Sequence, residues 1–495
     1  MLSVPQHSPS RDLSIPEMSS DKKSFIVFDP IYGFIYLTPA EHEIIHSPFY
    51  QRLRWIKQLG FSQYIFHGAE HSRFGHSIGV MFNAHKILES CGRAVSMEDL
   101  SDPKKQDAAT LYHRSVRLGA LLHDLGTFCF SHTTEGAYIS YGETTRKKNG
   151  KGLQDDHENL GSFIIKNTDY EGGITYILKK HSLDPQNISD LVKGVHSSVL
   201  ANQILHSEID CDRMDYLLRD AHYTGLKYGA YDRDYLLHHF QVMNVAGEDI
   251  LTIKNNALHC VEDFLMSRFA WYSQVIRSPR GAKYDAIAEH ICAYFLNKGL
   301  IYRYTDLLDM IKNNPMRFFR FNDNYFFDLV AETYSSGKLD GNSQVKEMAY
   351  TLLLERGART VRCEELRQIL LDKSDLAETD RVVRRAEAKV EEIKDYLKKN
   401  GGDKDWVIDD LPKKDISLVK SADQIAKSGN GVNVLLERDP VKISNDSGDI
   451  KLLADLENSV ISKLQNMTNY IPNVFVSKSF YQKLVDAKII DAEDS

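Results

Sequence analysis

Apolar residues recur at helical spacing along most of the chain. Four segments place them three and four positions apart, which predicts helices that bury one face or are buried throughout. These segments are HSIGVMFNAHKILESCG, SVRLGALLHDLG, LGSFIIKN and EIDCDRMDYLLRDAHYTG. A fifth, RVVRRAEAKVEEIKDYLKKNGG (381–402), is strongly charged and keeps its apolar side chains on one stripe. We interpret it as a solvated surface helix rather than as a basic nucleic-acid face.

Shorter stretches depart from this helical pattern. FIVFDPIYGFIYL and VMNVAGEDILTIKNNALHC each predict a β-hairpin, the second with its turn at Gly247, Glu248 and Asp249. Thr38 and Pro39 form a good N-cap and first position for the helix that follows the first hairpin. After residue 403, WVIDDLP, ISLVKS, GVNVLLE and DPVKIS alternate like short strands, and a helix is expected near 450–466.

These patterns predict a mostly α protein: a helical core with small β-hairpins, plus a small α+β C-terminal region. We expect four parts along the chain. They are a flexible tail at 1–24, a core at 25–300, a helical extension at 301–402 and the α+β region at 403–495.

Composition narrows the class of protein. With 495 residues, 42% apolar and 26% charged, the chain resembles a soluble globular protein with a sizeable core. Its net charge of −8 does not favour nucleic-acid binding, although a local basic pocket for a polyphosphate is compatible with it. Six scattered cysteines without a CxxC pair favour reduced thiols and a cytoplasmic location. Neither a signal peptide nor a membrane span is expected.

Four separated segments place His or Asp at helix starts or inside apolar helices: HSRFGHSIGV (71–80), LLHDLGTFCFSH (121–132), DDHENLGS (155–162) and SEIDCDRMDYLLRDAHYTG (207–225). Each alone is explained by a cap or a salt bridge, but four in one chain favour a metal site with mixed nitrogen and oxygen ligands. Such a site suits a divalent ion, namely Fe, Mn, Mg, Co or Zn, and hydrolysis assisted by that ion.

Other side chains are candidates for proton transfer and phosphate binding. His157 and Glu135 suit a proton-transfer pair, with a capped helix residue and an exposed loop carboxylate as the alternatives. Arg73, Arg213 and Arg268 suit forked contacts to phosphates, or equally intramolecular salt bridges. The sequence has neither a GxxxxGK[ST] loop nor a GxSxG elbow, which argues against P-loop nucleotide binding and a serine hydrolase.

From about residue 25 to residue 280 the chain resembles the HD-domain metal-dependent phosphohydrolases, and more narrowly their dNTP triphosphohydrolase branch. The resemblance rests on six strings in order: DPIYGFIYL, SPFYQRLRWIKQLG, HSRFGHSIGV, LLHDLG…FSH, HE and IDCDRMDYLLRDAHYTG. It implies an HD-domain helical core. It also implies cleavage of a dNTP to the deoxynucleoside and triphosphate, with water attacking the α-phosphorus.

The resemblance also implies residue roles. As metal ligands it implies His76, His123, Asp124 and Asp212. The catalytic groups it implies are His157 and Glu135 as the acid–base pair and His132 against the scissile ester. As substrate contacts it implies Gln58, Leu59, Arg73, Arg213, Tyr216, Asp220, Arg268 and Tyr272. Gln51 and Arg54 match an activator-nucleotide site of some members.

Three positions depart from the family pattern. Thr127 stands where many members have a catalytic His, and Ile276 stands where an aromatic ring seats the sugar. His46 replaces the carboxylate that reads guanine in the activator site, so an activator is expected not to be chosen as guanine in the same way.

The leading hypothesis is therefore a dNTP triphosphohydrolase that forms a homo-oligomer, a dimer or a tetramer, with activation by a nucleotide as an open alternative. Two further hypotheses keep the same fold. One is an HD-type phosphodiesterase or phosphohydrolase acting on another nucleotide or an oligonucleotide. The other is a catalytically weak nucleotide-sensing regulator, against which the intact ligand set argues.

Overall fold

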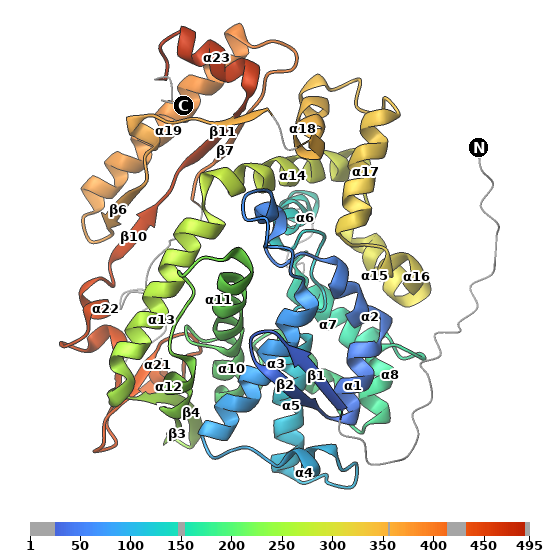
Figure 1. Ribbon diagram of the computed structural model, residues 1–495, viewed down its shortest axis with the longest axis vertical. Coiled ribbons are helices and arrows are strands. Elements are labelled where there is room, and N and C mark those ends of the chain that lie inside the picture. The colour runs from blue at the N-terminus through green and yellow to red at the C-terminus, as the bar shows by residue number, and fades with distance from the viewer. Residues whose placement is uncertain (1–24, 147–153, 355–356, 413–431, 491–495) are drawn as a thin grey trace.

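The computed structural model describes residues 25–146, 154–354, 357–412 and 432–490, and confirms a mostly α fold with small sheets (Figure 1). The expected tail at 1–24 and the expected strand in ISLVKS lie outside these residues. Among the described residues, no helix combines the length and apolar character needed to cross a bilayer.

The first hairpin forms as predicted. Strands β1 (Phe25–Asp29) and β2 (Gly33–Leu37) pair antiparallel, from Phe25 opposite Leu37 to Asp29 opposite Gly33. Helix α1 (Pro39–His46) then starts with a capping box in which Thr38 and Glu41 satisfy each other's backbone amides. The short helix α2 (Pro48–Gln51) and a 3-10 turn (Arg52–Trp55) lead into the core.

The core is a bundle of helices that pack around one large apolar cluster. Its central pair is α3 (Arg73–Ser90) and α5 (Ala108–Leu122), and α11 (Cys211–Thr224) packs against α3. Around them lie α4 (Met97–Ser101), α6 (His132–Arg146), α7 (His157–Asn167), α8 (Ile174–Lys180), α9 (Pro185–Val192), α10 (Val199–His206) and α12 (Arg233–His238).

The second hairpin, β3 (Phe240–Val245) and β4 (Glu248–Lys254), has a shorter turn than predicted. Val245 pairs with Glu248, so the turn is Ala246–Gly247 rather than Gly247–Asp249. Both turn residues have positive φ, 55° and 91°, because a two-residue turn of this twist suits a right-handed hairpin.

The remaining helices connect the core to the C-terminal part. Helix α13 (Leu258–Trp271) continues through a π-helical turn (Tyr272–Ile276) towards α14 (Pro279–Lys298), which packs on α6. The helical extension follows as α15 (Tyr304–Asn313), α16 (Pro315–Phe319), α17 (Asp323–Ser335) and α18 (Ser343–Leu354).

A second apolar cluster lies in the C-terminal part, at the top left of Figure 1. Helix α19 (Leu376–Asn400) contributes Ala386, Val390 and Ile393 to it from the predicted stripe. Short strands pair around it as β10–β6 and β5–β11–β7. Their bounds are β5 (Ala358–Thr360), β6 (Ile369–Asp372), β7 (Val407–Asp410), β10 (Met467–Tyr470) and β11 (Asn473–Ser477), and α23 (Lys478–Asp486) follows.

Segments after residue 403 share sheets with segments before it. Strand β8 (Lys442–Ser444) pairs parallel with β4 of the core, and β9 (Ile450–Leu452) pairs with β8. Two predictions for this region are wrong. Within GVNVLLE, Val432–Leu436 forms a short helix, α21, because a five-residue run with four apolar side chains suits either structure. The helix expected near 450–466 is only α22 (Val460–Lys463). The four-part division itself stays a prediction.

Candidate metal and phosphohydrolase site

His76 lies on the first turn of α3 and is fully buried. Its Nδ1 is 2.7 Å from Oδ2 of Asp215 on α11, which fixes the ring and directs Nε2 towards the centre of the site. Arg219 binds the same carboxylate through Nε at 2.8 Å. Gly79 permits this contact, since a Cβ there would lie 1.8 Å from Oδ1 of Asp215.

His123 and Asp124 sit where α5 ends. Nδ1 of His123 is 2.8 Å from the carbonyl oxygen of Ala120, so its Nε2 also faces the centre. Arg73 donates to Oδ2 of Asp124 at 2.6 Å, and the paired cation holds the pKa of this buried carboxyl well below its usual range despite burial. The helix end therefore presents one imidazole nitrogen and one carboxylate side by side.

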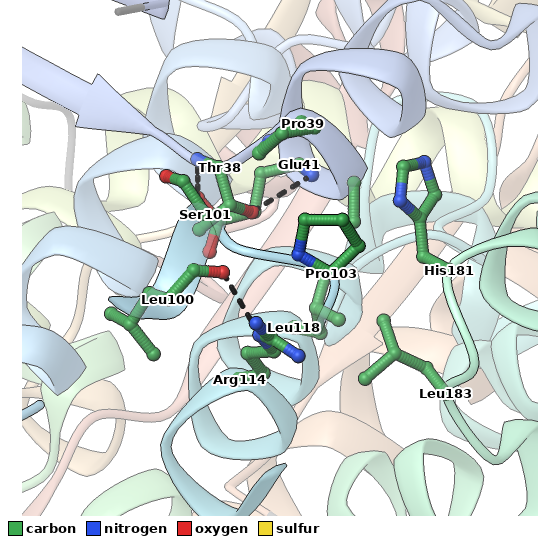
Figure 2. A pocket seen from close by; sticks show the side chains of 11 residues that line it. Thr38, Pro39, Glu41, Leu100, Ser101, Pro103, Arg114, Leu118, His181 and Leu183 are labelled. Atoms are coloured by element: carbon green, nitrogen blue, oxygen red, sulfur yellow. Dashed lines mark hydrogen bonds between the residues drawn. The ribbon is translucent and has the colours of Figure 1, made fainter. Parts of the chain in front are cut away.

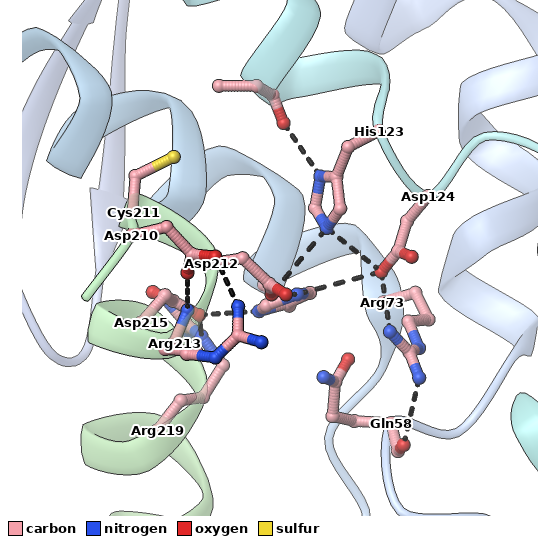
Figure 3. Close-up of polar contacts among 12 residues, drawn as sticks. Gln58, Arg73, His123, Asp124, Asp210, Cys211, Asp212, Arg213, Asp215 and Arg219 are labelled. Carbon is pink, nitrogen blue, oxygen red and sulfur yellow. Dashed lines mark hydrogen bonds and ion pairs between the residues drawn. The ribbon is translucent and has the colours of Figure 1, made fainter. Parts of the chain in front are cut away.

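Asp212, near the start of α11, completes the group (Figure 3). Its Oδ1 lies 3.0 Å from Nε2 of His76 and 3.7 Å from Nε2 of His123. Oδ2 of Asp124 lies 3.6 Å from Nε2 of His76 and 3.4 Å from Nε2 of His123. Three helices thus bring together the four residues that the family motif implies.

The chemistry of this group fits a divalent cation. Nε2 of His76 and Nε2 of His123 are buried without a hydrogen bond of good geometry, although they face carboxylates. Burial alone would lower the pKa of His76, yet Asp212 and Asp215 outweigh it and raise the pKa to about 9. A site that draws a proton onto a buried imidazole holds excess negative charge, which a cation would neutralise. Two imidazoles and two carboxylates are ligands for a hard or borderline ion.

A second polar group, formed by His132, Glu135 and His157, follows the turn that begins at His123 and Asp124. Oε2 of Glu135 is 2.6 Å from Nδ1 of His132, and its Oε1 is 2.7 Å from Nδ1 of His157. Glu135 is 6% exposed on α6, so it is not the exposed loop carboxylate that was the alternative. Burial favours the neutral acid, but the two histidines outweigh it and lower the pKa of Glu135. The carboxylate orients both rings and leaves their Nε2 atoms for other partners.

Gly126 explains how the two groups come close. A Cβ at this position would lie 2.2 Å from the carbonyl oxygen of His157 and 2.3 Å from the amide of Gly161. Only glycine therefore lets the start of α7 pack on the turn that follows Asp124. Asp124 is near enough to contribute to the raised pKa of His157.

The three arginines expected at phosphates are all engaged by acceptors in this structure. Arg73 contacts Asp124 and donates from Nε to Oγ of Ser131 at 3.0 Å. Arg213 pairs with Asp210, and Arg268 pairs with Glu208. An anionic substrate would compete with these carboxylates. Burial raises the pKa of the Asp210 carboxyl, although Arg213 opposes the shift.

The residues expected at the sugar and base form two groups. Gln58 is 7% exposed with no hydrogen bond to Oε1, beside the buried Leu59, and Figure 3 shows its amide pointing towards the metal-ligand group. Asp220 is fully buried instead, with its oxygens 2.7 Å from Nε2 of His71 and 3.1 Å from Nε1 of Trp271. These bonds make Asp220 a bridge between two side chains that the sequence did not single out.

Aromatic rings pack around this bridge. The ring of Tyr216 lies 4.6 Å from Trp271, and Tyr272 is half-buried in the π-helical turn that also contains Ile276. The sequence did not indicate a site role for Trp271, because a lone Trp in an apolar helix usually belongs to the core. Asp215 and Arg219 were overlooked for a related reason: their spacing of four is also that of a surface ion pair.

Two departures from the family pattern have structural roles here. Thr127 is 2% exposed and donates from Oγ1 to the carbonyl oxygen of Asp124 at 2.7 Å, so it stabilises the turn. His46 is exposed at the end of α1, with Nδ1 2.7 Å from the carbonyl oxygen of His42. Gln51 and Arg54, expected at an activator site, bond to each other at 2.7 Å.

A hollow of about 110 Å³ lies between α1, α4, α5 and α8 (Figure 2). Arg114 projects into its wall, but its guanidinium already donates to the carbonyl oxygens of Leu100, Asp99, Asp102 and Lys105. Because no predicted site residue lines this hollow, we regard it as a packing gap beside the end of α4.

Comparison with known proteins agrees with this geometry. Residues 73–220 match the HD domain family. The chain is 24% identical over 401 residues to the human deoxynucleoside triphosphate triphosphohydrolase SAMHD1, covering 74% of this chain and 59% of that protein. It is 35% identical over 253 residues to the uncharacterized protein YwfO of Bacillus subtilis, covering 51% of each. The chain thus spans about half to three fifths of the length of these two relatives.

Two solved structures share the fold over nearly the whole chain. A phosphohydrolase from Bacteroides thetaiotaomicron superposes with a TM-score of 0.60 at 18% identity, covering 92% of this chain and 99% of the other. A hypothetical protein from Aquifex aeolicus superposes with a TM-score of 0.61 at 24% identity, covering 93% and 98%. At these identities the likeness establishes the fold alone.

Proposed function

Because this chain is a member of the HD-domain superfamily, resembling its dNTP triphosphohydrolase branch, we propose that it hydrolyses a deoxynucleoside triphosphate to the deoxynucleoside and triphosphate. The observation that carries the proposal is the convergence of His76, His123, Asp124 and Asp212 beside the hydrogen-bonded group of His132, Glu135 and His157. One group suits a cation and the other suits proton transfer at the same substrate.

In this proposal the four ligands hold a divalent ion, which supplies an acidified water and neutralises phosphoryl charge when bound. His132, which is largely exposed, lies against the scissile ester, and His157 with Glu135 forms the acid–base pair that moves the proton. Glu135 keeps Nδ1 of each histidine protonated, so that Nε2 is the atom that reacts. Thr127 offers no imidazole, which places the proton transfer on these three residues.

Substrate recognition would follow from the arginines and the buried amide. Arg73, Arg213 and Arg268 would exchange their carboxylate partners for phosphate oxygens. Gln58 would use its unpartnered Oε1 at the sugar. In this view Asp220 shapes the sugar pocket through His71 and Trp271.

A substrate panel tests the proposal. Purified protein is incubated with each dNTP, each NTP and short oligonucleotides, in the presence of Mn, Mg, Co, Fe or Zn, and products are separated by ion-exchange chromatography. We expect inorganic triphosphate from at least one dNTP. Release of nucleoside monophosphates, or cleavage of oligonucleotides alone, would instead identify an HD-type phosphodiesterase. No turnover and no bound metal would identify a nucleotide-sensing regulator.

Assembly and activation are part of the proposal. We expect a dimer or tetramer by light scattering. Since His46 cannot offer guanine a two-oxygen acceptor, we expect GTP alone not to give full activity when it is titrated against each dNTP. Full activation by GTP alone would refute this expectation.

A further inference from the structure

The loop between Asp124 and His132 contains an unusual backbone. Phe130 and Ser131 have φ values of 54° and 57°, in the left-handed region that residues with a side chain rarely adopt. Phe130 is buried and stacks on Phe61 at 4.1 Å, so the loop cannot relax by turning this ring outwards. Such a conformation persists only where surrounding contacts determine it. His132 begins α6 directly after this pair.

A carboxylate from the helical extension holds this loop. Asp323 is the first residue of α17, is 5% exposed, and lies outside the region that matches the HD domain. Its Oδ1 accepts from the amide of Phe130 at 2.5 Å, and its Oδ2 accepts from the amide of Lys57 at 2.7 Å. One side chain therefore ties two loops of the core together.

Ser131 connects the same two loops from the other side. Its hydroxyl donates to the carbonyl oxygen of Lys57 at 2.5 Å and accepts from Nε of Arg73. Arg73 in turn contacts Asp124 and, at 3.5 Å, the carbonyl oxygen of Gln58. The position of the loop is thus transmitted to an arginine and to a metal-ligand candidate.

The buried position of Asp323 at the start of α17 is not explained by a capping role for that helix. Asn322 caps α17 by accepting from the amide of Tyr325, and Asp323 directs both oxygens to main-chain amides of other segments. The placement is also unfavourable for a carboxylate, since burial raises its pKa to about 7. A buried acid with two distant backbone partners is expected where a specific geometry is being fixed.

We propose that Asp323 is a positioning residue, which fixes the strained Phe130–Ser131 pair and thereby places His132 and Arg73 for phosphoryl chemistry. It touches neither substrate nor metal and acts through the loop. The kinetic part of this inference rests on the proposed function, whereas the geometric part does not.

A double-mutant cycle separates positioning from general destabilisation. Asp323→Asn keeps the size of the side chain but turns one acceptor into a donor that cannot bond an amide. We expect kcat per metal-loaded site to fall about tenfold or more, because small misplacements of a reacting group cost at least that much. In a His132→Gln background the same substitution should lower kcat by a clearly smaller factor, since one of the two groups it positions is gone and only the part that passes through Ser131 to Arg73 remains. Asp328→Asn, on an exposed position of α17, is the matched control and should stay within twofold of the wild type.

Two kinetic outcomes would overturn the inference. One is an Asp323→Asn enzyme within twofold of the wild type. The other is an equal loss in both backgrounds, which would indicate a structural role only. A wild-type protein that releases no triphosphate from any dNTP would instead refute the proposed function.

Kinetics cannot test Asp323 if the wild type releases no triphosphate, or if Asp323→Asn does not fold or load metal. In either case, hydrogen exchange measured on the wild-type protein tests the geometric part of the inference. The amides of Lys57 and Phe130 should exchange far more slowly than those of exposed loops, because both bond a buried acceptor. Unprotected exchange at either amide would overturn the inference.

Discussion

Asp215 holds His76 from behind: its Oδ2 lies 2.7 Å from Nδ1 of the imidazole, on the side opposite the nitrogen that faces the other ligand candidates. The same carboxylate is fixed by Arg219, whose guanidinium also reaches Asp29 of the first hairpin at 2.9 Å. The orientation of one ligand candidate therefore depends on a chain of buried charges that extends to the start of the described structure.

Asp215→Asn should weaken metal binding about tenfold to a hundredfold, since losing such an orienting carboxylate typically costs that much. The amide retains an acceptor for His76 but loses the charge that supports the imidazole and pairs with Arg219. Titration of the apo protein with Mn, followed by calorimetry, measures the effect. Asp234→Asn, at a side chain 87% exposed, is the control. Equal affinities for both variants would contradict the role of Asp215.

His123→Ala should abolish turnover and lower the metal content, because it removes a candidate ligand that faces the centre through Nε2. Activity is measured with the best dNTP of the panel, and metal by elemental analysis of the same sample. His238→Ala, at an exposed position of α12, should retain both. Substantial turnover by His123→Ala would refute the site assignment.

Glu135→Gln should move the alkaline limit of activity to lower pH. Burial alone would lower the pKa of His157, and Glu135 outweighs it, so that the pKa is raised to about 9. Without the carboxylate charge His157 loses its proton at lower pH, and kcat at pH 8 should fall about a hundredfold, within the range for general acid–base catalysis. A pH–rate profile checks this, with Glu143→Gln on the exposed side of α6 as control. An unchanged alkaline limit would exclude this proton-transfer role.

Acid should destabilise the fold through a buried histidine pair. Nε2 of His113 lies 3.0 Å from Nδ1 of His85, and the amide of Val95 donates to Nδ1 of His113, so His113 accepts there as the neutral ring. Burial, with Arg117 nearby, lowers the pKa of His113 to about 4, and burial also lowers that of His85. The unfolded chain takes up a proton near pH 6.5, so this stability is complete above pH 6.5 and is lost as pH falls towards 4.

For His113 alone, linkage gives a loss of about 2 kcal/mol at pH 5. Melting temperatures at pH 5, 6 and 7.5 should therefore fall towards acid. His113→Gln, which cannot take up a proton, should be less stable at pH 7.5 but show a shallower decline. Parallel declines for the two proteins would show that other groups govern acid unfolding.

The sequence predicted those parts of the site that a short motif carries. His76, His123, Asp124 and Asp212 each belong to a string that places a polar residue at a helix start or end, and helix packing then brings them together. Asp215 stood in the same string, yet a spacing of four from Arg219 also describes a surface pair. Asp323 and Trp271 had no local signal, because their partners lie in other segments of the chain and only the tertiary fold shows them.

Secondary structure was predictable where the periodic pattern of apolar residues continued over a long segment. The core helices and the first hairpin agree with their patterns, and α19 buries the stripe expected of it. Short apolar runs did not distinguish a strand from a helix. Val432–Leu436 alternates as a strand would, yet it forms a helix. The parallel pairing of β8 with β4 joins residues about 190 positions apart, a distance over which local patterns carry no information.

Arg52 binds the carbonyl oxygens of Leu125 and Thr127 in the HD turn and that of Phe321 in the extension, and it is 2% exposed. Three segments from different parts of the sequence therefore share one buried cation. The stretch that matches the HD domain family, residues 73–220, therefore does not contain the side chain that holds its own turn in place.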